Sequence, residues 1–255
     1  MTLEMAALAL AGFAAGFVDA IAGGGGLIQI PALLLLLPPE LASSVALVLG
    51  TNKVSSTCGT AVAVHRYNRH LQLPWRELAP AMATGFLCAW LGARMVAWVP
   101  TGVMRPLVLV LLLVVAAWTA WNRDWGASPA APKKRAVWAA PLFAAAMGFY
   151  DGFFGPGTGS FLTAGFIVWM GCDFLNASAR TKAINLATNL GALLCFALAG
   201  KVSWKYGLPM AACNIAGGLL GAELAVAKGS VFVRRLFLAV TCLLILRLGW
   251  DLLRG

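Results

Sequence analysis

Residues 16–31 read GFVDAIAGGGGLIQIP, and residues 148–159 read GFYDGFFGPGTG. Each stretch lies deep within a long apolar run and places glycines, in the second copy with proline, shortly after an aspartate. Glycine costs a helix about 1 kcal/mol and proline about 3 kcal/mol. We therefore expect the helices that contain these two stretches to break there.

The composition predicts that the chain lies in a membrane. Of its 255 residues, 61% are hydrophobic and 11% are charged, and the mean hydropathy is +0.84. Soluble domains are about 45–50% apolar and about 25% charged, so one water-exposed globule could not bury this much apolar surface. The net charge of +10 comes mainly from connectors between apolar runs, where Lys and Arg orient a membrane protein. The expected partner is the lipid bilayer; nucleic acid is not expected, because no contiguous basic, aromatic-interleaved surface is present.

Long apolar runs predict the membrane spans, because a bilayer core of about 30 Å needs about 20 helical residues. The expected fold is all-α integral membrane, with about eight transmembrane segments as two homologous four-span repeats. The first span of each repeat is the run that breaks at its glycine-rich stretch. In chain order the runs are 5–37, 42–65, 77–99, 102–121, 137–170, 174–199, 206–227 and 231–253.

The two halves of the chain are copies of one unit. The stretch Gly16-Phe17-Val18-Asp19 matches Gly148-Phe149-Tyr150-Asp151. Further matches follow in the same order: Lys53 with Lys182, Trp75 with Trp204, Pro80 with Pro209, Gly92 with Gly221, and Arg105 with Arg234. The predicted divisions are a first repeat at 1–122, a cytoplasmic linker at 123–136 and a second repeat at 137–255. The repeats are parallel if each run crosses once, and they can be inverted if the broken runs are re-entrant hairpins.

Each break creates a backbone site that suits an anion. The segment after the break has about eleven residues, so as a helix it spans about 16 Å. Its first amides have no carbonyl partners and its dipole end is positive, which favours an oxyanion. The alternative is that the glycines only permit close helix packing. The expected backbone contributors are Gly23, Gly24, Gly25, Gly26, Gly155, Gly157 and Thr158.

Two lysines at membrane depth are the expected side-chain partners of that anion. Lys53 follows Asn52 in a polar cluster of the second run. Lys182 shares one helix face with Asn185 and Asn189, and these two amides, together with Asn52, are expected to bind the anion beside the lysines. A lysine inside the bilayer costs several kcal/mol unless it is paired or hydrated, which makes it a candidate for function.

Asp19 and Asp151 precede the breaks and are candidates for proton coupling. Each is expected near the C-terminal end of a half-helix, where the dipole and the low dielectric favour the protonated form. Two alternatives stay open. Each aspartate caps the amides of its own glycine loop, or it serves only structure in an ion pair within its repeat, Asp19 with Lys53 and Asp151 with Lys182.

These residues resemble the TauE/SafE family, the group of sulfite exporters and toluene-sulfonate uptake permeases. The resemblance rests on residues 16–26 with Pro31, on residues 148–159, and on the Thr-Asn-Lys and Arg-Thr-Lys cores at 51–53 and 180–182. It covers nearly the whole chain and implies four-span repeats that transport sulfur-containing or related organic anions in either direction. Pro156 and Thr158 interrupt the denser glycine run that the second repeat of the family usually carries, so this half-site is expected to be reshaped.

The expected function is secondary transport of a small anion, such as sulfite or a sulfonate, coupled to protons. An enzyme is not expected, because the sequence shows no H-E-x-x-H motif, no G-x-S-x-G motif in context and no carboxylate–histidine cluster. An anion channel or a structural subunit of a membrane complex is the alternative. No cofactor or metal is expected, since the six cysteines lie singly and form no C-x-x-C pair.

The connectors predict the location and orientation of the chain. Their basic residues place both termini in the cytoplasm of a bacterium, with the chain in the cytoplasmic (inner) membrane, if each run crosses once. Arg94 and Glu223 carry opposite charges at matched positions of the third and seventh runs, so we expect an ion pair between them. The sequence leaves a monomer and a homodimer open.

Overall fold

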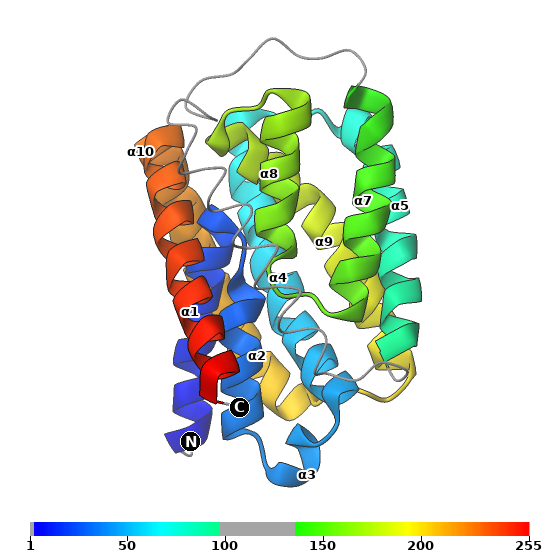
Figure 1. Cartoon of the computed structure of the whole chain (residues 1–255), viewed down its shortest axis with the longest axis vertical. Helices are drawn as coiled ribbons and strands as arrows, with labels where there is room; N and C mark the ends of the chain where they lie inside the picture. Colours follow the sequence, from blue (N-terminus) through cyan, green and yellow to red (C-terminus); the bar gives the residue numbers. More distant parts are fainter. Residues whose placement is uncertain (1–2, 97–135, 255) are drawn as a thin grey trace.

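The computed structural model describes residues 3–96 and 136–254, and every regular element in these residues is a helix. The expected span at 102–121 and nearly all of the expected linker lie outside the described residues. The helices are α1 (Leu3–Ala22), α2 (Gly25–Leu36), α3 (Pro39–Ala42), α4 (Val45–Leu71), α5 (Trp75–Met95), α7 (Ala136–Phe153), α8 (Thr158–Met170), α9 (Phe174–Leu198) and α10 (Trp204–Arg254) (Figure 1).

The helices α1 and α2 form a hairpin rather than one broken crossing. Leu8, near the start of α1, packs in one cluster with Leu33, near the end of α2, so the two helices lie side by side and antiparallel. The chain reverses at Gly23 and Gly24, whose φ angles of 68° and 146° are ones that other residues rarely adopt. The break is where the sequence predicts it, but the run at 5–37 returns toward the side from which it entered.

The helices α7 and α8 form a second hairpin in the same way. The rings of Phe143, near the start of α7, and Trp169, near the end of α8, meet edge to face with centroids 4.5 Å apart. Gly155 and Gly157 form the turn, with φ angles of 93° and 84°. The expected single span at 137–170 is therefore also a hairpin.

The two hairpins enter the molecule from opposite ends. In Figure 1 the α1–α2 hairpin opens toward the lower end, where both chain termini lie, and the α7–α8 hairpin opens toward the upper end. Their tips meet in the middle, where a Cβ built on Gly159 would lie 2.7 Å from the Cα atom of Gly23. Ser160 donates to the carbonyl of Ala22 at 3.2 Å, and also to that of Gly23. The hairpins are inverted relative to each other, which is the second arrangement that the sequence left open.

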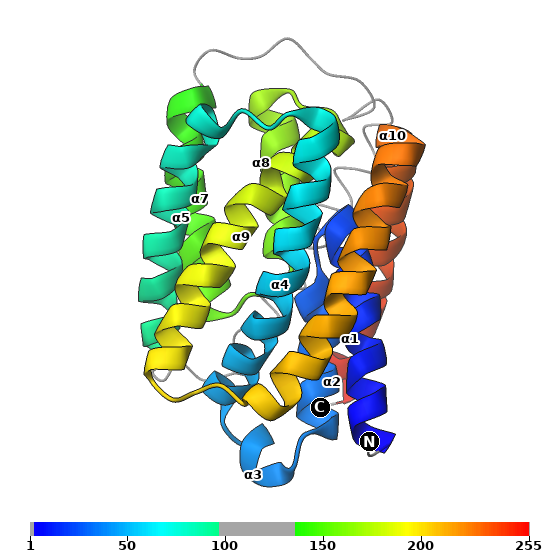
Figure 2. The ribbon, with the colours of Figure 1, turned by 180° about the vertical axis from the view of Figure 1, so that it is seen from behind.

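Each hairpin packs its first helix against a helix of the other half. The helix α1 lies along α10, and α7 lies along α5 (Figure 2). Small residues allow both contacts: a Cβ on Gly148 would lie 2.4 Å from the carbonyl oxygen of Gly85, and one on Gly221 would lie 2.5 Å from that of Phe17. The helices α4 and α9 contact each other and the hairpins, so the two halves interlock around the hairpin tips.

The outer surface suits lipid. Segments long and apolar enough to cross a membrane, by length and composition, are Leu3–Ala22, Phe174–Leu198 and Trp204–Ala239. Large apolar side chains such as Leu10, Leu87 and Leu142 are 61–77% exposed. On a water-soluble protein such a surface would promote aggregation. The chain is therefore a multi-pass membrane protein.

Four of the expected runs correspond to α4, α5, α9 and the first arm of α10. The last two runs, expected at 206–227 and 231–253, are the two arms of α10, which meet at a non-helical residue, Gly229 (φ 74°). Because both broken runs are hairpins and residues 97–135 are not described, the expected total of eight spans is not confirmed, and the boundaries of the repeats stay predictions.

Candidate functional site

A small polar cavity lies where the hairpin tips meet α4 and α9. Its volume is about 20 Å³. A buried water molecule needs roughly 10–15 Å³ by the same measure, so the cavity has room for about one water. The predicted site residues that line it are Asp19, Gly24, Gly26, Asn52, Lys53, Asp151, Gly155, Gly157, Thr158, Asn185 and Asn189.

Three other predicted residues lie just outside the cavity lining. Gly23 packs against Gly159 at the meeting of the tips. Gly25 donates its backbone N–H to Asp19, and Lys182 is buried in an ion pair with the same aspartate. All three contact the site without facing the cavity.

The sequence reasoning missed several residues at the site. Ser56 and Gly159 line the cavity. The fully buried Gln29 of α2 donates to Ser55 of α4 at 2.6 Å, which ties the first hairpin to the polar cluster of α4. Gln29 follows the glycine run by one turn, and a polar residue between two isoleucines was a signal that could have identified it.

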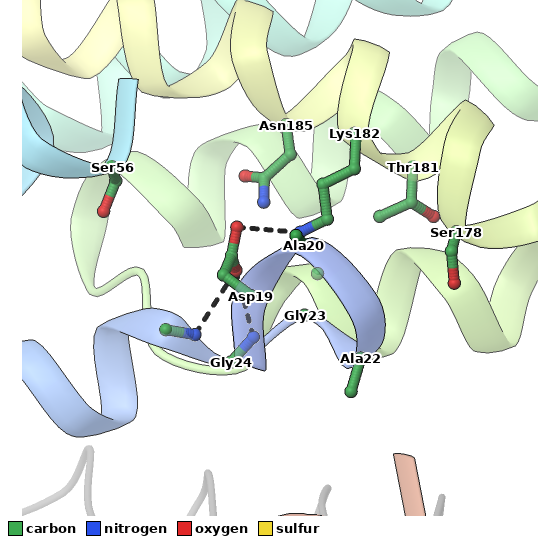
Figure 3. A network of polar contacts seen from close by, with 12 residues as sticks. Asp19, Ala20, Ala22, Gly23, Gly24, Ser56, Ser178, Thr181, Lys182 and Asn185 are labelled. Carbon is green, nitrogen blue, oxygen red and sulfur yellow. Dashed lines mark hydrogen bonds and ion pairs between the residues drawn. The ribbon is translucent and has the colours of Figure 1, made fainter. Parts of the chain in front are cut away.

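The Asp19 carboxylate is held on both sides. Its Oδ1 accepts the backbone N–H groups of Gly24 at 3.1 Å and Gly25 at 3.3 Å, and its Oδ2 accepts from Lys182 Nζ at 2.8 Å (Figure 3). The N-cap residue of α2, Gly24, has no side chain to cap the helix. Asp19 accepts the first N–H groups of α2 in its place. This is the capping role that the sequence left open. Together with the lysine, these contacts stabilise the ionised carboxylate.

Asp151 is held less completely. Its Oδ2 lies 2.8 Å from Lys53 Nζ, and both side chains are 3% exposed. The two groups are in direct ionic contact, although the angles at this oxygen are not those of a hydrogen bond. Lys53 Nζ instead donates to Asn189 Oδ1 at 2.8 Å. Asn52 Oδ1 is likewise buried without a partner in the described part of the chain.

The ion pairs differ from the alternative considered in the sequence analysis, in which each lysine pairs with the aspartate of its own repeat. Lys53 pairs with Asp151 and Lys182 pairs with Asp19, so each lysine binds the aspartate of the other half. The pairing within each repeat is wrong because the inverted hairpins bring each tip against the central helix of the other half. The expected pair of Arg94 with Glu223 is also replaced: Glu223 pairs with Arg66 at 3.1 Å.

Side chains from other helices bind the carbonyls of the first tip. Tyr67 of α4 donates its hydroxyl to Ala20 O at 2.8 Å, and Ser178 of α9 donates to Ile21 O at 3.1 Å. Figure 3 shows Ser178 beside this tip, together with Lys182 from the same helix. The last carbonyls of α1, which a helix end leaves without partners, are therefore satisfied by neighbouring helices.

The corresponding hydrogen bonds of the second tip come from its own hairpin. Tyr150 donates its hydroxyl to Pro156 O at 2.8 Å, and Thr158 donates to Gly155 O at 2.8 Å. The helix α8 starts after Gly157, which provides no side-chain cap. The second tip is thus braced internally and leaves the start of α8 facing the cavity.

The charges of the site balance. Two buried ammonium groups face two carboxylates, and all four lie at or beside one cavity. In a low dielectric, an added anion is costly unless a positive charge accompanies it or a carboxylate is neutralised. The described residues contain no group of three or more His, Cys, Asp or Glu side chains that could hold a metal ion.

A sequence model of the family described as "Sulfite exporter TauE/SafE" matches residues 8–248. The "Probable membrane transporter protein ORF9" of Sinorhizobium sp is 37% identical over 251 residues, which are 97% of this chain and 93% of that protein. A "Probable membrane transporter protein" of Haemophilus influenzae is 32% identical over 97% of this chain and 95% of its own length.

The "Probable membrane transporter protein YfcA" of Escherichia coli K12 is 31% identical over 93% of this chain and 86% of its own length. No solved structure is significantly similar to the chain. The names of the relatives and the family description indicate a membrane transporter rather than an enzyme. The chain belongs to the TauE/SafE family.

Proposed function

We propose that this protein is a secondary transporter that moves a small sulfur-containing anion, such as sulfite or a sulfonate, together with protons across the bacterial cytoplasmic membrane. The observation that carries the proposal is the small polar cavity between two inverted hairpin tips, with two buried lysine ion pairs beside it. The family description names sulfite export, which supports a sulfur oxyanion as the substrate class.

The inverted hairpins support transport by alternating access. Transporters with inverted repeats bind substrate near the membrane midplane, where broken helices of the two repeats meet. Here Gly23 of the first tip touches Gly159 of the second, and the cavity beside them holds only about one water. A channel needs a continuous path for its ion, so a centre this narrow favours a transporter over the alternative of an anion channel.

The charge balance supports proton coupling. A monoanion that enters a site of two lysines and two aspartates makes it negative, and one proton on an aspartate restores neutrality. Asp19 and Asp151 line the cavity and are the carboxylates proposed to carry that proton. The coupled ion is therefore a proton on one of these two residues.

The two hairpins change the side of the membrane on which the termini are expected. Cytoplasmic termini were predicted on the assumption that each run crosses once, and both hairpins instead return to their own side. In Figure 1 the α4–α5 connection and the bend within α10 lie at the end opposite the termini. Basic residues near these two positions are Arg66, Arg69, Arg76, Lys228, Arg234 and Arg235. At the other end they are Arg94 near the end of α5, Lys201 and Lys205 at the α9–α10 connection, and Arg254 at the end of α10. By the positive-inside rule this distribution favours termini outside the cytoplasm, and a reporter fused to either terminus tests it.

Flux measurements on proteoliposomes test the function. We expect uptake of radiolabelled sulfite to saturate, to rise with an imposed proton gradient and to be lost in Lys53→Gln. Lys201→Gln, which changes an exposed lysine at the end of α9, is the matched control and should transport normally. Flux that rises linearly with sulfite and ignores the proton gradient would support a channel. Wild-type protein that moves no sulfite, sulfate or sulfonate would refute the proposed substrate class.

A further inference from the structure

We infer that the two half-sites differ in role. Asp151 occupies the anion position at Lys53 in the empty transporter, and the substrate displaces it. The ion pair of Asp19 with Lys182 stays intact throughout transport. This inference rests on the proposed function and narrows it to one lysine and one proton carrier. It follows from four features of the two sites: access, bonding, space and charge.

Access to the cavity distinguishes the two lysines. Lys53 lines the cavity, and so does its partner Asp151. Lys182 is not part of the lining; it is 1% exposed and its Nζ donates to Asp19 Oδ2. An anion inside the cavity therefore meets the Lys53 ammonium first.

Bonding distinguishes the two carboxylates, and the sequence explains why. Asp19 accepts the N–H groups of Gly24 and Gly25. When the Gly-Phe-x-Asp stretches are aligned, the residue that corresponds to Gly24 in the second copy is Pro156. Proline has no backbone N–H, so the second tip lacks one of the two donors that hold the first aspartate. Among the described residues, Asp151 is held by its ion pair with Lys53 at Oδ2, so it is the easier carboxylate to displace.

Space favours that displacement. The cavity of about 20 Å³ accommodates about one water, whereas sulfite has four heavy atoms and a sulfonate has more. A carboxylate group has three heavy atoms and lies against Lys53 Nζ. When the Asp151 side chain turns away, the anion gains both the volume and the ammonium that the carboxylate occupied.

Unused polar groups are ready for the incoming anion. Asn52 lines the cavity, and its Oδ1 is buried without a hydrogen-bond partner among the described residues. A rotation of this amide replaces an unsatisfied acceptor with an N–H donor. The uncapped start of α8 after Gly157 adds backbone amides and a positive dipole end.

The displaced carboxylate takes up the coupled proton. Once Asp151 loses Lys53, its charge is buried without a partner, which is strongly unfavourable. A proton from water that binds the carboxylate removes this charge as the anion adds its own. One proton therefore accompanies each monoanion, and the net charge of the site is unchanged.

The neighbours of Asp151 agree with this assignment. Lys53 of α4 is the cation in contact with it, and Asp19 lies across the same cavity, with Lys182 of α9 bound to Asp19. Tyr150 of the same helix bonds Pro156. The helix α8 has no charged residue. The charged side chain of α5 near the tip, Arg94, is exposed.

Anion binding by matched variants tests the inference. The purified full-length protein in detergent is titrated with sulfite, sulfate and methanesulfonate at pH 6 and pH 8, with Asp151→Asn compared with Asp19→Asn. We expect Asp151→Asn to bind anion at least about tenfold more tightly than wild type at pH 8, because no carboxylate competes for Lys53. Wild-type affinity should fall between pH 6 and pH 8 more steeply than that of Asp151→Asn. Protonation of the anion itself affects both proteins equally, so the comparison isolates the effect of Asp151.

Further variants keep each outcome decisive. Asp151→Asn/Lys53→Gln, which removes both charges of the pair, should fold and bind no anion. Tighter, pH-insensitive binding in Asp19→Asn but not in Asp151→Asn would assign the roles the other way and overturn the inference. Equal effects of both changes would also overturn it, while leaving the proposed transporter intact. If neither wild type nor Asp151→Asn binds any of the three anions, the proposed function fails and the inference fails with it. If Asp151→Asn does not fold, Asp151→Ser takes its place.

Discussion

The two hairpin tips share a sequence pattern and a place in the fold, yet they are held by different parts of the molecule. The first tip receives hydrogen bonds from α4, α8 and α9, and its aspartate caps its own amides. In the second tip, the described hydrogen bonds to the turn carbonyls come from Tyr150 and Thr158 of the same hairpin. The two copies of a duplicated unit can therefore occupy equivalent places in the fold and still differ in role. A few side chains make the Asp19 half fixed and the Asp151 half exchangeable with substrate.

The largest effect should come from the fixed half. Asp19→Ala leaves Lys182 buried without its carboxylate and removes the acceptor of two backbone amides. Breaking one side of a buried ion pair costs about 3–5 kcal/mol, so the protein should unfold at a markedly lower temperature. Thermal unfolding in detergent measures this. Asp151→Ala should cost less, because Lys53 keeps its bond to Asn189; an equal or larger loss in Asp151→Ala contradicts the comparison.

The meeting point of the tips should be the next most sensitive position. In Gly23→Ala the new Cβ would lie 2.5 Å from backbone of Gly159, at a φ of 68°. Strain of this kind costs about 1–3 kcal/mol. Gly26→Ala is the matched control, because its Cβ would meet Pro156 at 3.7 Å, an ordinary contact. If the melting temperatures of the two variants coincide, the tips do not touch as described.

Restoring symmetry should weaken anion binding. Pro156→Gly supplies the second tip with the backbone N–H that Gly24 supplies to the first. A hydrogen bond to a carboxylate contributes about 1.5–3 kcal/mol, so Asp151 should compete better for its place and anion affinity should fall by about tenfold or more. Equilibrium binding at one pH measures the change. Unchanged affinity would show that the missing N–H does not set the difference between the tips.

The smallest effect should come from a single bond to the first tip. Tyr67→Phe removes the hydrogen bond to Ala20 O and leaves the ring in place, so it should cost about 1 kcal/mol of stability. Tyr150→Phe removes the bond to Pro156 O within the second hairpin. We expect Tyr67→Phe to lower the melting temperature with normal flux, and Tyr150→Phe to alter flux more than stability. The opposite pattern would contradict the assignment of the first tip to structure and of the second tip to transport.

Much of this site could be predicted from the sequence, because the signals are local. Four consecutive glycines at 23–26 interrupt any helix, and Lys53 and Lys182 at membrane depth need partners. The cavity lining includes most of the residues that these signals identify. Pro156 and Thr158 also indicated that the second tip would differ from the first.

The pairing of the charges could not be predicted, because it depends on packing between distant segments. Whether a broken run crosses or turns back is not encoded in the break itself; it is settled by contacts such as that of Leu8 with Leu33. Once the runs are hairpins, the halves invert and Lys53 meets Asp151 rather than Asp19. Arg94 lost its expected partner for the same reason, since Glu223 lies beside Arg66.

The position of a bound anion tests the central claim most directly. A structure determined with selenite, whose selenium atom can be located by its anomalous scattering, shows where a sulfite-like anion binds. The account predicts selenium between the hairpin tips, within hydrogen-bond reach of Lys53 Nζ, with the Asp151 carboxylate turned away from that lysine. Selenium beside Lys182, or absent from the space between the tips while the protein transports selenite, would contradict it.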